Sequence, residues 1–97
     1  MIRKKKVSAD TMEVTFILSA PIEGQSVSVV GDFNEWQPGA LHFDMKPDNT
    51  FSATTSLPVG RQYAFRYLTE HGRWFDEDAA DGFQPNEYGS GNCLLYT

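Results

Sequence analysis

The sequence predicts an all-β fold, a sandwich or barrel made of short strands. Apolar and polar residues alternate along most segments, which is the period of a half-buried strand. Turn-forming clusters separate these segments at intervals of about 8–12 residues, the spacing of small β-sandwiches and barrels. Phe, Tyr and Trp make up 13% of the 97 residues, so the chain has enough bulky side chains to fill a small core.

The alternation is clearest in QYAFRYL, where it places three aromatic residues on one face and Arg66 on the opposite, solvent-facing side. In LHFDM the same pattern turns Leu41, Phe43 and Met45 inward. No segment carries an apolar stripe at helical spacing. The expected strands cover residues 13–18, 26–30, 41–45, 50–57, 62–68, 73–75 and 92–96.

Charge is unevenly distributed along the chain. The net charge is −5, yet four of the eight basic residues stand together at residues 3–6. The remainder carries four basic against 13 acidic residues, so the body of the domain is not expected to bind nucleic acid or another polyanion. The basic start, within residues 1–8, is expected to be a frayed and solvated terminus. Contact with nucleic acid or anionic lipid is the alternative for this segment.

Nothing in the sequence indicates a membrane protein or a secretory signal. No apolar run approaches the ~18 residues of a membrane helix, and no apolar segment follows the basic start. The single cysteine, Cys93, cannot form an internal disulfide and is expected to be an inert, buried thiol in the last strand. We therefore expect one domain over residues 1–97, located in the cytoplasm.

Neither a metal site nor a cofactor is expected. Asp76, Asp78 and Glu87 match positions 1, 3 and 12 of a calcium-binding loop, but the glycine comes one place late and no helices flank the segment. Residues 76–82 are therefore predicted to form a solvated acidic loop. The two histidines stand apart from each other and from the cysteine, which disfavours zinc or triad chemistry.

The stretch GDFNEWQPG places a large indole, that of Trp36, among turn residues. Four further motifs follow, in the order MKPDNTF, LPVGRQYAFRY, GRW and NEYGSGN. This succession, within residues 14–96, resembles the family 48 carbohydrate-binding modules. Those modules include the glycogen-binding domain of the AMP-activated protein kinase β-subunit and the N-terminal early-set domains of isoamylases and branching enzymes.

The resemblance implies an immunoglobulin-like, early-set antiparallel β-sandwich of about seven to eight strands. It also implies non-catalytic binding of α-1,4-linked glucans, such as glycogen, starch and malto-oligosaccharides, by a short stand-alone module. A glucan-metabolising enzyme is implied as a protein partner. The carbohydrate-binding residues that the resemblance implies are Trp36, Arg66, Trp74, Tyr88, Ser90 and Asn92.

The side-chain types at these positions suit a glucan. A glucan presents a flat C–H face, which fits an exposed aromatic ring, and a rim of hydroxyls, which fits planar groups such as guanidinium and amide. Trp36 adjoins Pro38 and Gly39, and Trp74 follows a turn. Both rings are therefore expected to be only partly buried.

Other interpretations remain open on the residues alone. The two tryptophans can instead cap the ends of the sandwich, and Asn86, Ser90 and Asn92 can bond their own backbone in turns. The fold can also serve as a protein–protein interaction or regulatory module that has lost sugar binding. Catalysis is not expected, because a glycosidase needs two carboxylates that flank the scissile bond in a cleft.

Overall fold

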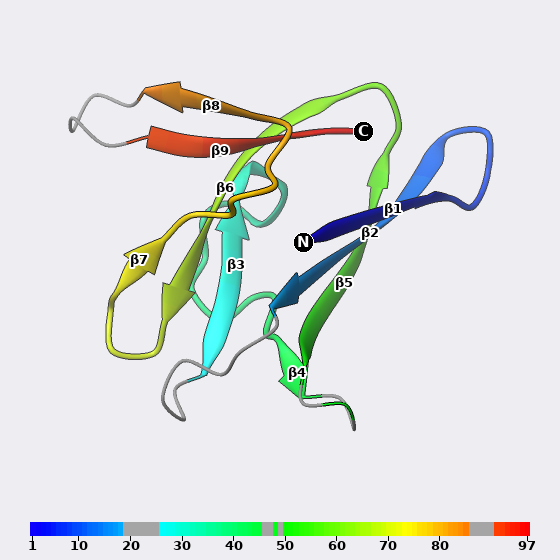
Figure 1. Ribbon diagram of the computed structural model, residues 1–97. Coiled ribbons are helices and arrows are strands. Elements are labelled where there is room, and N and C mark those ends of the chain that lie inside the picture. Colours follow the sequence, from blue (N-terminus) through cyan, green and yellow to red (C-terminus); the bar gives the residue numbers. More distant parts are fainter. Residues whose placement is uncertain (19–25, 46–47, 49, 86–90) are drawn as a thin grey trace.

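Two antiparallel β-sheets pack face to face in the computed structural model, which describes residues 1–18, 26–45, 48, 50–85 and 91–97 (Figure 1). Sheet A has the strand order β1-β2-β5-β4, and sheet B has the order β3-β6-β9-β8, with β7 also paired to β6. The predicted all-β sandwich is confirmed. The strands of the described residues are β1 (Ile2–Lys6), β2 (Thr11–Leu18), β3 (Val27–Gly31), β4 (Asp44–Met45), β5 (Phe51–Pro58), β6 (Gln62–Thr69), β7 (Trp74–Phe75), β8 (Gly82–Pro85) and β9 (Gly91–Tyr96).

An aromatic core fills the space between the sheets. β2 contributes Val14 and Phe16, β6 contributes Phe65 and Tyr67, and all four side chains are fully buried. The rings of Phe16 and Tyr67 meet edge to face with centroids 6.3 Å apart, an arrangement that aromatic rings favour. Burial of each such side chain contributes about 1.5–3 kcal/mol. Cys93 of β9 is buried as predicted, and burial raises the pKa of its thiol.

The predicted strand LHFDM divides between the two sheets. The Leu41 carbonyl accepts the Val29 amide at 2.9 Å and the Phe43 amide donates to the Val27 carbonyl at 3.0 Å, so this part extends sheet B beyond β3. The next two residues form β4 and pair with β5 in sheet A. Leu41 and Phe43 pack against the core as predicted, whereas the side chain of Met45 lies outside the described part of the chain.

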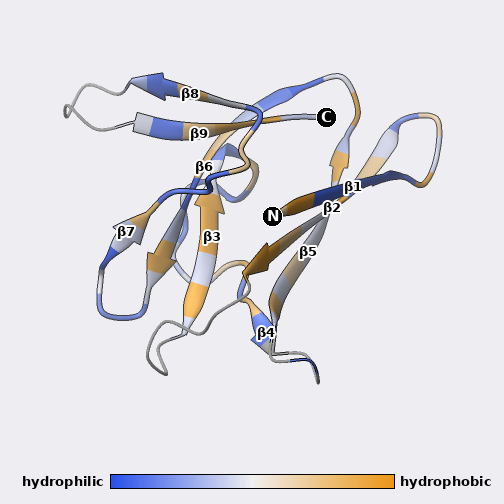
Figure 2. Ribbon diagram, viewed as in Figure 1, coloured by the Kyte–Doolittle hydropathy of each residue, from blue (hydrophilic) through white to orange (hydrophobic). Residues whose placement is uncertain are grey.

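The basic start of the chain forms an edge strand instead of fraying. β1 pairs with β2 over its whole length, and Lys4 makes an ion pair with Asp81, which precedes β8 in sheet B. The expectation that this terminus is frayed is therefore wrong. The sequence did not predict this strand because four consecutive charged residues show no alternation of apolar and polar side chains. Most of β1 is hydrophilic in Figure 2. Lysines on an edge strand discourage pairing with other chains.

A buried carboxylate joins the loop after β7 to the core. Glu77 is only 5% exposed, and its Oε1 accepts a hydrogen bond of 2.9 Å from the Tyr67 hydroxyl. The Ala79 amide and the amino-terminal ammonium of Met1 also donate to this carboxylate, at 2.9 and 2.7 Å. Burial alone would raise the pKa of Glu77, but these donors hold the pKa below its usual value. The prediction that this loop is solvated is therefore wrong for Glu77.

We expect the chain to lose stability in acid partly through Glu77. Because its pKa is lower in the folded than in the unfolded chain, the carboxylate stabilises the fold above the unfolded value of about 4.3. That contribution is lost as the pH falls through the folded pKa. Glu77→Gln should lower the free energy of unfolding at neutral pH by about 1–3 kcal/mol and flatten the acid dependence.

Urea unfolding followed by circular dichroism, at neutral and acid pH, measures both effects. Asp78→Asn is the matched control, because Asp78 is an exposed carboxylate of the same loop. An acid dependence in Glu77→Gln as steep as that of the unsubstituted chain would contradict the role assigned to Glu77.

Candidate functional site

Three of the six predicted site residues, Arg66, Trp74 and Asn92, lie on the face of sheet B turned away from sheet A, called here the outer face. Along β6 the core residues alternate with Ala64, Arg66 and Leu68, which therefore point outward. Trp74 of β7 pairs with Leu68 and points to the same side. Ala64 and Leu68 are nearly buried although they lie outside the core cluster. The outer face thus has an apolar floor that larger side chains cover.

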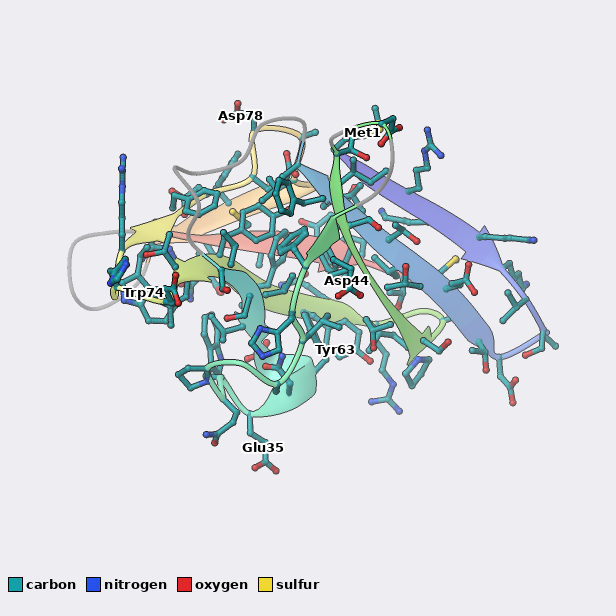
Figure 3. All side chains as sticks on the ribbon, turned by 90° about the horizontal axis from the view of Figure 1, so that it is seen from below. Met1, Glu35, Asp44, Tyr63, Trp74 and Asp78 are labelled. Atoms are coloured by element: carbon teal, nitrogen blue, oxygen red, sulfur yellow. The ribbon has the colours of Figure 1, made fainter. Side chains whose placement is uncertain are left out.

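Trp74 and Arg66 pack against each other on this floor. The guanidinium carbon lies 5.6 Å from the centroid of the indole, within the range of a cation–π contact. Arg66 Nε–H donates to Asp76 Oδ1 at 2.9 Å, which orients the guanidinium beside the ring. Trp74 remains 42% exposed and lies at the periphery of the molecule in Figure 3. Arg66 leaves the core as predicted, but its side chain is only 18% exposed because the indole and the carboxylate flank it.

A turn with unusual backbone geometry carries Trp36. After β3, one 3-10 turn, η1 (Asp32–Asn34), is followed by Glu35 and Trp36 with left-handed φ values of 57°. Non-glycine residues rarely adopt such values. The Asn34 side chain accepts the Gly31 amide at 3.0 Å and donates to a β3 carbonyl at 2.9 Å. These two hydrogen bonds hold the turn against β3 and so offset the cost of its backbone.

Asp32 ties this turn, and the indole with it, to β6. Its Oδ2 accepts the Ala64 amide at 2.8 Å, and its Oδ1 accepts Nε1–H of Trp36 at 3.0 Å. The backbones approach closely, since a Cβ at Gly31 would lie 2.5 Å from the Ala64 carbonyl oxygen. Ala64 and Arg66 are about 6.7 Å apart along the strand, so both indoles are anchored to neighbouring positions of β6. Trp36 is partly buried, as predicted.

Asn92 reaches the outer face from β9. The β6–β9 register places it level with Arg66, and it points outward because its neighbour Cys93 lies in the core. Asn92 is itself partly buried. The residues of the sequence analysis that lie outside the described part of the chain are Asn86, Glu87, Tyr88 and Ser90.

Sequence reasoning missed Asp32 and Asp76, the two carboxylates that hold the indole and the guanidinium. Asp32 belongs to the GDFNEWQPG motif, in which only Trp36 was predicted to be a site residue. Asp76 falls in the loop predicted to be solvated. The signal that identifies Asp76 is the alternation of β7, which continues past its last residue. Trp74 and Asp76 point outward, whereas Phe75 and Glu77 pack inward.

The site is an open surface that exposes one indole, orients a guanidinium beside it and includes a partly buried amide. Such groups can receive a flat ligand with hydroxyls at its edge. Within the described ranges, no group of three or more His, Cys, Asp or Glu side chains is placed to hold a metal ion. The same ranges contain no helix with the length and hydropathy needed to span a membrane.

These features define a two-sheet β-sandwich with an aromatic, hydrogen-bonding surface on one sheet. No family model matches the chain. Over 67 residues, 66% of its length, the chain is 42% identical to the 1,4-alpha-glucan branching enzyme GlgB of Rhodopirellula baltica, of which the match covers 9%. Its fold is similar to that of the enterobactin esterase FES from Shigella flexneri, with a TM-score of 0.64 and 12% identity over 98% of this chain and 32% of that one. The esterase therefore shows the fold alone, and the chain spans a small part of both relatives.

We expect Asp32→Ala to loosen the Trp36 turn. The substitution leaves the Ala64 amide and the Trp36 indole N–H without their acceptor, so the free energy of unfolding should fall by about 1–3 kcal/mol. Urea unfolding gives this value, and fluorescence in a Trp74→Phe background reports Trp36 alone. The control is Glu35→Gln, because Glu35 is an exposed neighbour in the same turn. Unchanged stability and unchanged emission in Asp32→Ala would refute the tether.

Proposed function

We propose that the chain is a non-catalytic module that binds α-1,4-linked glucans on the outer face of sheet B. The observation that carries the proposal is the exposed Trp74 ring, held beside Arg66, with Trp36 tethered to the same strand. Asn92 would add an amide at the rim of the site. Tyr88 and Ser90 are further contacts that the family resemblance proposes.

The site suits this ligand because two of its side chains are held in place before the ligand binds. An indole fits the C–H face of a sugar, while guanidinium and amide groups bond the hydroxyls at its edge. The ion pair with Asp76 restrains Arg66, and the hydrogen bond to Asp32 restrains Trp36, so less side-chain freedom is lost on binding. The contact area remains small, so we expect dissociation constants on the order of micromolar to millimolar.

The similarity to a branching enzyme supports a glucan as the ligand. The matched segment is only 9% of that enzyme, which is the size of an accessory module. We therefore propose a glucan-metabolising enzyme as the protein partner. The open surface supports a role without catalysis, because hydrolysis of a glycosidic bond needs paired carboxylates that enclose it.

The test is affinity gel electrophoresis on glycogen or starch. Trp36→Ala and Trp74→Ala should each abolish retardation, since loss of an aromatic contact worth about 1.4 kcal/mol or more weakens binding tenfold or more. Phe83→Ala is the matched control: Phe83 is 58% exposed but pairs with Cys93, a residue of the core side. Circular dichroism verifies the fold of each variant. Unchanged retardation in both tryptophan variants would reject the site.

A second candidate, a protein–protein interaction module, is favoured by the edge of sheet B. Among the described strands β8 pairs with β9 alone, and it exposes Phe83 at that edge. Such an edge can receive a strand or an apolar patch of a partner. This alternative predicts self-association that Phe83→Ser removes, seen by sedimentation velocity, and no chemical-shift change with maltoheptaose. A monomer that responds to maltoheptaose would exclude it.

A further inference from the structure

A groove on the outer face is lined by Leu68, the residue of β6 that pairs with Trp74. Ser28 of β3 and Leu68 of β6 form its floor, with 5% and 9% exposure. Gly39, His42 and the turn between β6 and β7, with Glu70, also line the groove. Its volume is about 310 Å³, at the lower end of small-molecule sites.

Strand pairing places the groove in one row with Trp74. His42 bridges to Ser28, Ser28 pairs with Leu68, and Leu68 pairs with Trp74, so the four residues form one row across the strands. Residues paired in this way point to the same face of a sheet. Three inter-strand spacings of about 4.8 Å separate the ends of the row, so Trp74 and His42 lie about 14 Å apart.

The chemistry of the groove resembles that of the Trp74 surface. Leu68 offers an apolar floor, while His42 and Glu70 place an imidazole and a carboxylate at its sides. The ring of His42 lies close to Gly39, whose added Cβ would be 3.4 Å from Nε2. The Glu70 carboxylate also accepts the Ser26 amide at 3.2 Å. An apolar floor with a donor–acceptor imidazole suits a neutral, hydroxyl-bearing ligand, and the carboxylate disfavours an anion.

We propose that this groove is a second subsite for the same glucan, so that a chain stacked on Trp74 continues over Leu68 to His42. The inference rests on the proposed function. The imidazole of His42 exchanges hydrogen bonds with sugar hydroxyls, and the carboxylate of Glu70 accepts one. The module then binds long glucans more tightly than short ones, because only a long chain reaches both the indoles and the groove.

Isothermal titration calorimetry of the full chain with maltotriose and with maltoheptaose tests the subsite. His42→Ala should weaken maltoheptaose binding about three- to tenfold, the effect of one lost hydrogen bond, and leave maltotriose binding unchanged. Glu70→Gln should act in the same direction. His71→Ala is the matched control for loss of an imidazole: His71 lies in the same turn as Glu70, with its Nε2 4.0 Å from that carboxylate, but it does not line the groove.

The outcomes separate the two proposals. If the unsubstituted chain binds maltoheptaose and His42→Ala binds it equally well, the groove is not a subsite and the proposed function stands. An equal loss for both sugars would place His42 in the indole site and overturn a separate subsite. If the unsubstituted chain binds neither sugar, the proposed function fails and the groove assignment fails with it.

Discussion

Side-chain alternation along β6 is the constraint on which the rest of the structure depends. The strand lies between β3 on one side and β7 and β9 on the other, and its residues Phe65 and Tyr67 are fully buried. A slip of one residue would exchange the two faces of the strand and turn Arg66 into the core. Burial of an unpaired charge would lower the stability of the fold by several kcal/mol. The register that buries the aromatic rings of β6 therefore also places the guanidinium on the outer face.

The segment after β6 extends this alternation to both faces of sheet B. Asp76 points outward and binds Arg66, whereas the next residue, Glu77, points inward and binds the Tyr67 hydroxyl. Two adjacent carboxylates therefore connect one short segment to the surface and to the core. The inward carboxylate fixes the path of the backbone, and that path sets the position of the outward carboxylate. The orientation of the guanidinium at the surface thus depends on a buried hydrogen bond.

The sandwich alone does not determine what the chain does. A part of an esterase shares the fold at 12% identity, and one fold can support many unrelated functions. The distinguishing features are an indole on the outer face that is 42% exposed and a Trp36 turn with left-handed φ values. Backbone strain of this kind costs about 1–3 kcal/mol, and an exposed indole gains little from burial. Neither Trp74 nor Trp36 belongs to the buried core between the sheets.

The sequence by itself determined the strands whose inner face is apolar, which are β2, β3, β5, β6 and β9, and it placed Trp36 in a turn. It also placed Arg66 on the side of β6 away from the core, since a period of two assigns each side chain to a face. The tertiary structure alone decided that the basic start forms β1, that LHFDM divides between the sheets, and that Asp32 and Asp76 hold the surface groups. The reason is physical: a local pattern records which face of a strand is apolar, but not which strand becomes its neighbour. The contacts of Asp32 with Ala64 and of Lys4 with Asp81 join residues far apart in the chain, so they exist only once the strands of each sheet have found their register and the two sheets have packed.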